Sequence, residues 1–380
     1  MFVRGVHKHF TGWPAPPGVS AKRDSRYITR LPKPNATPAK ENAMPPPDLP
    51  RIAIALGDPA GIGPEIALKA ALDAGVRAIC RPILFGDRGV LETHARACGL
   101  TPRIHSVATA MDRVNSDVTA LVERTQFKAG ELRIGELAAA HGLAALDSGR
   151  AAIEAALRHE VDAVVAAPMT ETAIKMAGIE FDGYPSFVAR CTNTPIEDAF
   201  LMICFEREGR EMRIVHTTLH VSLRHAIELV TRERVLHSIK AAHTALKRIG
   251  IASPRIAVSG LNPHASEGGL FGDDERLIIA PAIADAQALA MDADGPFGAD
   301  TIFHKPGYDA CVVMTHDQGH VAAKSLAIDR TAGLTIGTPI LFSSVAHGSA
   351  YDIAGQNKAS PRAVIEAIRR LAGASVLPAG

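Results

Sequence analysis

The sequence predicts an α/β protein built on a mostly parallel sheet. From Arg51 onward, short apolar runs that suit buried strands alternate with longer alanine-rich segments that suit helices, and this alternation is typical of βαβ units. The chain has 380 residues, of which 47% are hydrophobic, so it can bury a large core. Because single cores stop growing near ~250–300 residues, we expect two lobes.

The spacing of apolar residues and the length of each segment distinguish the predicted helices from the predicted strands. The clearest helix is 232–249, where apolar residues recur at three- and four-residue spacing on one face. Strands are predicted at 51–56, 81–85, 163–167, 213–217, 256–260, 310–314 and 340–344. Helices are predicted at 64–74, 87–98, 148–159, 170–177, 223–230, 232–249, 277–291 and 361–371.

Residues 1–49 have a different composition from the rest. They hold nine prolines, eight Lys or Arg against three Asp or Glu, and no apolar periodicity, so we expect a disordered tail. It lacks the apolar region of a secretory signal. An organelle transit peptide stays open as an alternative, although the amphipathic pattern is missing. The simpler interpretation is that translation starts at Met44.

Composition excludes several classes of partner. The formal net charge is +1, which gives no electrostatic case for nucleic acid or an anionic membrane. There is no run of about 18 apolar residues that could span a bilayer. The five cysteines are scattered and form no CxxC pair, a pattern that suits free thiols in a reducing compartment. We therefore expect a cytoplasmic protein with a small-molecule ligand.

Three histidines occur in three loop-like polar segments. They are His220 in 217–223, His264 in 260–269 and His316 in 314–319, and carboxylates stand close to the last two in sequence. Neutral imidazole is the commonest protein ligand for a transition metal, and three protein ligands with one open position describe a catalytic metal. With sixteen histidines in the chain, chance proximity to polar residues is the alternative.

Two glycine-bearing turns follow predicted strands. The first is Gly57-Asp-Pro-Ala-Gly-Ile-Gly-Pro-Glu-Ile66 and the second, at 344–355, contains His347-Gly-Ser-Ala-Tyr-Asp-Ile-Ala-Gly355. In the first, Pro64 suits the opening of a helix, whose N-terminus offers free N–H groups. It does not match GxGxxG, so a purely structural joint remains equally open.

Together these two turns resemble the isocitrate and isopropylmalate dehydrogenase superfamily, in which the second loop holds the adenosine of NAD(P). The resemblance implies a two-lobed fold of that type, with 50–185 and 306–380 forming the lobe that carries the cofactor loop and 186–305 forming the lobe with the metal and dimer contacts. It also implies that NAD or NADP is contacted by His347, Gly348, Ser349, Ala350 and Asp352.

Four motifs in order narrow the resemblance. Gly-Asp-Pro-Ala-Gly-Ile-Gly-Pro-Glu, Gly-Leu-Asn-Pro-His-Ala-x-Glu-Gly-Gly, Gly-Pro-x-x-Ala-Asp-Thr and His-Asp-Gln-Gly look like the 4-hydroxythreonine-4-phosphate dehydrogenase family, from about residue 51 to 372. The resemblance implies one divalent metal (Zn, Mg, Mn or Co) at a homodimer interface, bound by His220, His264 and His316. It further implies carboxylates beside the metal at Asp300 and Asp317 and a substrate-contacting Lys324, for which we expect a charge or proton-relay role.

The substrate positions depart from that family. Where its namesake has Gly-His-Thr-Glu-Phe, this chain has Gly183-Tyr-Pro-Ser-Phe187, and an expected asparagine and arginine align with Gly333 and Phe342. A phosphate dianion needs charge-assisted donors, so a pocket lined by Tyr184, Pro185, Ser186, Gly333 and Phe342 predicts a non-phosphorylated substrate. Sequence drift around an unchanged ligand is the alternative.

Segments 171–186, 215–220 and 262–268 are more similar to the terephthalate dihydrodiol dehydrogenase branch of the family. This resemblance implies NAD(P)-dependent oxidation of a cis-dihydrodiol dicarboxylate with decarboxylation, in aromatic catabolism, and leaves Lys324 and Arg190 to meet carboxylates. Two alternatives remain. One is a phosphorylated hydroxy acid substrate, as in pyridoxal phosphate synthesis. The other is a non-enzymatic metal- or nucleotide-binding module, against which the histidine triad and the adenosine-type loop in one chain argue.

Overall fold

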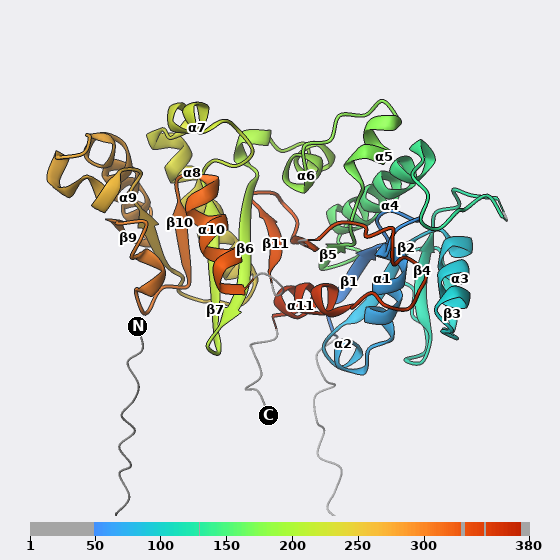
Figure 1. Cartoon of the computed structure of the whole chain (residues 1–380). Coiled ribbons are helices and arrows are strands. Elements are labelled where there is room, and N and C mark those ends of the chain that lie inside the picture. Colours follow the sequence, from blue (N-terminus) through green and yellow to red (C-terminus); the bar gives the residue numbers. More distant parts are fainter. Residues whose placement is uncertain (1–48, 129, 328–330, 346, 374–380) are drawn as a thin grey trace, which may run out of the picture. The chain divides into compact units, whose positions relative to one another are not determined.

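A computed structural model of the protein describes residues 49–128, 130–327, 331–345 and 347–373 (Figure 1). Met44 and all but the last residue of the expected disordered tail at 1–49 lie outside these ranges. In the described part of the chain, no helix is long and apolar enough to cross a membrane. The five cysteines are free, as their spacing predicts.

One twelve-stranded sheet forms the centre of the fold, in the order β3-β4-β2-β1-β5-β12-β11-β6-β7-β10-β8-β9 (Figure 1). Only the pairs β12–β11, β11–β6 and β6–β7 are antiparallel, so the sheet is mostly parallel, as predicted. Its strands are β1 Arg51–Ala55, β2 Arg81–Gly86, β3 Ile104–Val107, β4 Thr119–Glu123, β5 Ala163–Ala166, β6 Phe200–Arg207, β7 Arg210–His216, β8 Arg255–Ser259, β9 Asp292–Phe297, β10 Ala310–Val313, β11 Ala332–Ile336 and β12 Phe342–Val345.

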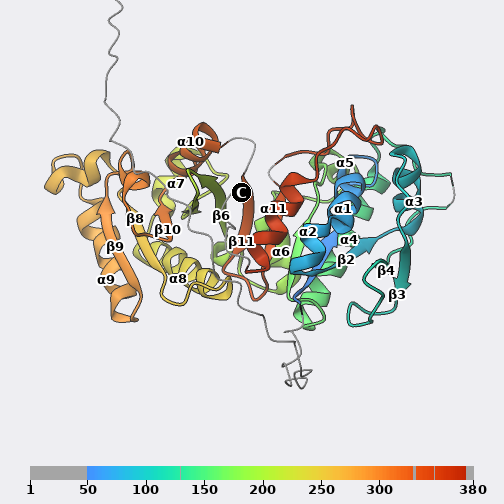
Figure 2. The same ribbon diagram turned by 90° about the horizontal axis from the view of Figure 1, so that it is seen from below.

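Helices cover both faces of this sheet. They are α1 Gly63–Leu72, α2 Ala74–Ile79, α3 Arg88–Ala97, α4 Ala139–Leu157, α5 Glu171–Met176, α6 Tyr184–Thr192, α7 Leu223–Leu229, α8 Arg232–Arg248, α9 Ala280–Ala288, α10 His316–Ala327 and α11 Arg362–Leu371. One large core joins the sheet to α1, α8, α9 and α11, and α11 packs beside α1 and α2 (Figure 2). Separate clusters join the other face to α4 and α6, and to α10.

All seven predicted strands are present, with ends shifted by at most three residues, and the predicted helices are present as well. Helix α4 begins at Ala139, nine residues before its predicted start. The prediction missed these residues because the buried polar side chains His141 and Ser148 interrupt the apolar pattern. In the 277–291 segment, a π-helical turn at Glu275–Ile279 precedes α9. The division into lobes 50–185 with 306–380 and 186–305 stays a prediction.

Several elements were not predicted: β3, β4, β6, β9, β11, α2, α6 and α10. Helix α10 matters most, because His316 is its first residue rather than part of a loop. His94, within α3, is 0% exposed.

Candidate functional site

The turn after β1 is held against neighbouring backbone. Gly57 has φ +67°, and a Cβ there would lie 2.3 Å from the carbonyl oxygen of Pro168, so the position requires glycine. Asp58 is 0% exposed and its Oδ1 accepts a 2.9 Å hydrogen bond from the Ala60 amide. The turn is therefore a fixed platform at the carboxyl end of β1.

The 347–355 loop packs on this platform. Ser349 accepts a 2.8 Å hydrogen bond from the Ile62 amide at its carbonyl and a 2.7 Å bond from the Thr170 hydroxyl at its Oγ. Tyr351 donates a 2.6 Å bond to Oδ2 of the buried Asp58. Among the predicted cofactor residues, Ser349 is buried, Ala350 half-buried, and His347, Gly348 and Asp352 exposed.

Strand directions bring these two segments to one edge of the sheet. Strand β5 runs parallel to both β1 and β12, so the carboxyl ends of the three strands meet there. In open α/β sheets this edge is where ligands bind. The predicted cofactor loop therefore lies at the usual binding edge of its half of the sheet.

Tyr184 and Pro185 open α6 near the same edge. The Tyr184 hydroxyl donates a 2.5 Å hydrogen bond to the carbonyl oxygen of Ala167, just beyond β5. Burial raises the pKa of the Tyr184 phenol, which keeps it a neutral donor. Ser186 is buried and donates to Asp182, and Arg190 Nη2 contacts the same carboxylate at 3.0 Å.

Gly333 and Phe342 lie inside the fold. Phe342 is 1% exposed, and its ring centroid is 5.3 Å from that of Tyr184. Gly333 faces Ser344 across the β11–β12 pair, and a Cβ there would approach Leu201 to 3.1 Å. The aromatic pair of Tyr184 and Phe342 thus occupies positions where the family's phosphate-holding side chains were expected.

Histidines from the end of β7, from the segment after it and from α10 form a cluster at the other predicted site. The ring centroids of His220 and His316 are 5.6 Å apart. His316 also stacks on His320, with centroids 3.8 Å apart and an interplanar angle of 11°, and His320 is 4.6 Å from His216. Two members of the predicted triad therefore lie together, with two further histidines beneath them.

His216 and His320 were not among the predicted site residues. Desolvation lowers the pKa of His216 to about 3 and that of His320 to about 4, with further lowering by neighbouring histidines. Both imidazoles are therefore neutral near pH 7. Their signal in the sequence is the four-residue spacing from 216 to 220 and from 316 to 320, which puts the last pair on one face of a helix.

A half-buried amide, Gln318, and a buried carboxyl group, Glu275, fix the segments that carry the histidines. Gln318 accepts hydrogen bonds from the Met314 and Thr315 amides and donates to the Gly260 carbonyl at 3.1 Å. Glu275 accepts from the Leu261 and Asn262 amides at 2.8 and 2.7 Å. Desolvation would raise the pKa of Glu275, but these bonds outweigh it and lower the pKa, so the carboxylate stays charged.

His264 lies in the segment that Glu275 and Gln318 anchor. Its Nδ1 is 3.9 Å from Oδ2 of Asp300, and the two side chains are 64% and 60% exposed. On α10, His316 Nδ1 lies 2.7 Å from Oδ1 of Asp317. Lys324 is exposed on the same helix, two four-residue steps beyond His316, and close enough to lower the pKa of His320 further.

The donor chemistry of this region suits a divalent transition metal, because imidazole nitrogens lie beside carboxylates. Within the described part of a single chain, however, no group of three or more His, Cys, Asp or Glu side chains is arranged to hold a metal. His220 lies with His316, and His264 lies with Asp300. The joint binding of one metal by His220, His264 and His316 therefore stays a prediction.

Comparison with known proteins identifies the family. Residues 78–371 match the model of the family described as pyridoxal phosphate biosynthetic protein PdxA. The chain belongs to the PdxA family. The family resemblance drawn from the sequence motifs is thereby confirmed.

Relatives within the PdxA family carry different names. A protein of Symbiobacterium thermophilum named "Putative D-threonate 4-phosphate dehydrogenase" is 41% identical over 84% of this chain and 95% of its own. The 1,2-dihydroxy-3,5-cyclohexadiene-1,4-dicarboxylate dehydrogenase of Comamonas sp is 40% identical over 84% of this chain and 96% of its own. A crystal structure of a terephthalate 1,2-cis-dihydrodiol dehydrogenase from Burkholderia xenovorans LB400 is 41% identical with a TM-score of 0.67, covering 87% of this chain and 99% of that one.

Membership of the PdxA family makes this chain a dehydrogenase, an oxidoreductase that acts on a CH–OH group of a small molecule. The relatives' names include both phosphorylated and non-phosphorylated substrates, so the choice between them depends on the residues of this chain.

Proposed function

We propose that the protein is an NAD(P)-dependent, divalent-metal-assisted dehydrogenase that oxidises and decarboxylates a non-phosphorylated cis-dihydrodiol carboxylate. The observation that carries the proposal is the packing of Tyr184 on Phe342 at 5.3 Å, with the Tyr184 hydroxyl already donating to Ala167. Where a phosphate would need cationic and hydroxyl donors, this wall offers an aromatic ring. An alicyclic diene packs well on such a surface.

Bound NAD(P) would accept the hydride, and a divalent cation would supply Lewis acidity at the substrate oxygen. The exposed edge of the cofactor loop, at His347, Gly348 and Asp352, is free to contact the nucleotide. Asp317 holds the His316 imidazole in one orientation through its 2.7 Å contact. Lys324 would sit close to the developing oxyanion, as a cation that stabilises it or relays its proton.

The proposed reaction balances without a further reactant. Hydride leaves the CH–OH carbon for the nicotinamide and the hydroxyl proton leaves to solvent or a base, which gives a ketone. A carboxylate on the adjacent carbon is then β to that carbonyl, so the C–C bond breaks to release CO₂ and its electron pair enters an enolate. In a cyclohexadiene ring this enolate is already aromatic, and protonation of its oxygen gives the aromatic diol, so aromatisation drives the second step.

The apolar surface around the histidines supports a homodimer as the active form. Large apolar side chains there remain exposed: Val221, Leu223, Ile227, Leu270, Phe271 and Val321. An apolar patch of this kind marks an interaction site, and closed twofold dimers are the commonest assembly. A second copy docked there would bring its own imidazoles to the pair formed by His220 and His316, which supports a metal site completed between subunits.

The experiment compares kcat/KM for NAD(P) reduction with the cis-dihydrodiol of terephthalate and with 4-phosphohydroxythreonine. We expect a preference of at least about a hundredfold for the diol, because a partly buried, unpaired dianion costs several kcal/mol and each ~1.4 kcal/mol is tenfold. The matched variant Tyr184→His with Pro185→Thr should raise activity on the phosphorylated compound. Equal or better kcat/KM on that compound in the unmodified enzyme would falsify the assignment.

A phosphorylated hydroxy acid is the second candidate substrate. The relative named for a D-threonate 4-phosphate activity is as similar to this chain as the dihydrodiol enzymes are. In that case Lys324 and Arg190 would have to supply the phosphate's donors, although Arg190 already contacts Asp182. The same kinetic comparison, extended to 4-phospho-D-threonate, separates the two candidates.

A further inference from the structure

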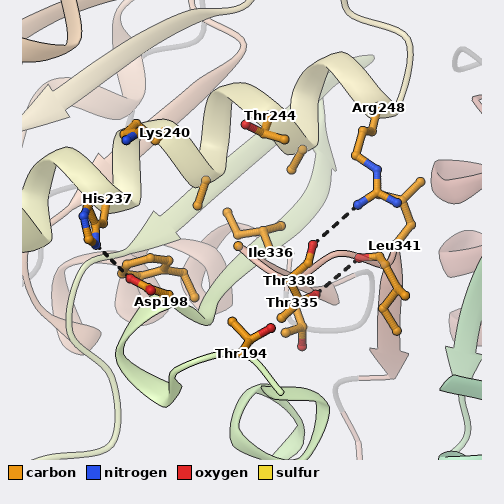
Figure 3. Close-up of a pocket in the computed structure, with 15 residues that line it drawn as sticks. Thr194, Asp198, His237, Lys240, Thr244, Arg248, Thr335, Ile336, Thr338 and Leu341 are labelled. Carbon is orange, nitrogen blue, oxygen red and sulfur yellow. Dashed lines mark hydrogen bonds and ion pairs between the residues drawn. The ribbon is translucent and has the colours of Figure 1, made fainter. Parts of the chain in front are cut away.

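A cavity of about 320 Å³ lies between α8 and the turn that joins β11 to β12 (Figure 3). This volume is at the lower end of the ~300–1,000 Å³ range of small-molecule sites. None of the predicted cofactor, metal or substrate residues lines it. The cavity is therefore a separate feature of the fold, and its chemistry can be considered by itself.

The floor of the cavity is apolar. Phe200 at the start of β6 and Ile336 at the end of β11 are 2% and 3% exposed. Ile340 and Leu341 extend this surface along the turn, and Ala245 of α8 contributes a small side chain that leaves room above it. A ring or short hydrocarbon body of a ligand would bury apolar area here, which is favourable by about 25 cal/mol per Å².

The α8 side of the cavity is polar and cationic. Lys240, Thr244 and Arg248 follow one another at four-residue spacing, so they lie along one face of the helix (Figure 3). Lys240 has no hydrogen-bond or ion-pair partner among the residues that the structure describes. Arg248 donates only one long bond, 3.5 Å from Nη1 to the carbonyl oxygen of Thr338.

Asp198, the acidic side chain among the lining residues, does not neutralise these cations. Asp198 is engaged by His237, whose Nδ1 lies 2.7 Å from its Oδ1 (Figure 3). Burial lowers the pKa of the Arg248 guanidinium, with no carboxylate to offset the desolvation. Two cations without an anionic partner thus stand over an apolar floor.

We propose that this cavity is a second ligand site that binds a small carboxylate with a ring-sized apolar body. The carboxylate would accept hydrogen bonds from Arg248 and from the Thr244 hydroxyl one helical turn before it. Lys240 lies two turns from Arg248, about 12 Å along α8, and would add electrostatic attraction rather than a hydrogen bond to the same group. The planar guanidinium fork matches a carboxylate. The apolar floor distinguishes such a ligand from an inorganic anion, which would leave that surface unused.

The test uses the full chain and 4-fluorobenzoate, followed by ¹⁹F NMR titration. We expect saturable binding that weakens at least about tenfold in the double variant Lys240→Ala, Arg248→Ala, since charge-assisted hydrogen bonds contribute ~1.5–3 kcal/mol. The matched control is Lys247→Ala, which removes an exposed cation of α8 outside the cavity and should bind like the unmodified protein. The single variants Lys240→Gln and Arg248→Gln each remove one positive charge while keeping a polar side chain, and each should weaken binding.

Four results would overturn the proposal. One is the lack of saturable binding by the unmodified chain, and another is unchanged affinity in the double variant. The third is loss of binding in Lys324→Ala, which would assign the probe to the predicted catalytic region. Inorganic phosphate at the same concentration should fail to displace the probe, and displacement by phosphate would contradict a carboxylate with an apolar body. Because the readout is binding at residues outside the predicted active site, its failure leaves the proposed dehydrogenase function unaffected.

Discussion

At the scale of single residues, the contact between Tyr351 and Asp58 ties the predicted cofactor loop to the turn after β1. The phenol donates a 2.6 Å bond to a carboxylate that is 0% exposed. Sequence reasoning found both segments but could not pair these two side chains, which are 293 residues apart.

Replacing Tyr351 with Phe should lower the free energy of unfolding by about 1–3 kcal/mol, because it leaves a buried charged acceptor without its donor. NADH binding should weaken as well, since the loop loses a fixed contact. The matched control is Tyr308→Phe, which also removes a phenol–carboxylate hydrogen bond, the 3.0 Å bond to Asp294. The Asp294 side chain is 41% exposed, so water can replace the lost donor. Chemical denaturation and fluorescence titration with NADH measure the two effects. If both variants lost the same free energy of unfolding, the burial of Asp58 would not explain the importance of the Tyr351 bond.

At the scale of elements, α10 decides how the histidines are arranged. Its first turn, His-Asp-Gln-Gly, is polar and contains glycine, so the sequence favours a loop. The helix forms there because Gln318 binds the two amides that precede it and because the helix packs on the core of β6, β7 and β10. Tertiary packing of this kind regularly overrides local propensity.

Gly319 shows how closely α10 approaches β7. A Cβ at this position would lie 2.3 Å from Nε2 of His216 and 2.8 Å from Cγ2 of Ile214. We expect Gly319→Ala to destabilise the fold by about 1–3 kcal/mol through overpacking and to displace the His216 ring. Gly348→Ala is the control, since its Cβ would meet nothing within 4 Å, and it should leave the melting temperature nearly unchanged. A Gly319→Ala variant as stable as the control would refute this packing.

At the scale of the whole molecule, the exposed apolar patch around His220 and His316 predicts a homodimer. Leu223 is 66% exposed and Ile227 is 48% exposed. Large exposed apolar patches are rare on monomers and mark interaction sites. Leu223→Asp with Ile227→Asp should therefore yield a monomer in sedimentation velocity, with loss of bound metal and of activity. Leu157→Asp, at the end of α4 away from the histidines, should stay dimeric and active. A fully active monomer at assay concentration would refute the shared site.

Stability should also fall in mild acid, because His94 is buried. Burial lowers its pKa, although the Pro59 carbonyl and the nearby Glu65 and Asp58 act in the opposite direction. Below about pH 6.5 the unfolded chain binds a proton at this histidine that the folded chain does not. The stabilisation that the neutral His94 contributes is thus fully present above about pH 6.5. It is lost as the pH falls toward the lowered pKa of His94 in the folded chain.

The comparison of unfolding free energies at pH 7.5 and pH 5.5 isolates this effect. His94→Gln should reduce the acid-induced loss relative to the unmodified chain, whereas His105→Gln, at an exposed position in β3, should leave the loss unchanged. Identical pH profiles for all three proteins would show that His94 does not contribute.

The sequence by itself determined the α/β class, seven of the strands, the two glycine-bearing turns and the family. These follow from local chemistry, since apolar period, glycine geometry and motif order are all written along the chain. Only the tertiary structure decided that His316 opens a helix, that His216 and His320 lie beneath it, that Tyr184 covers Phe342, and that Lys240 and Arg248 face an apolar cavity. Each of these depends on contacts between residues distant in sequence, and their energies come from burial and packing rather than from local propensity.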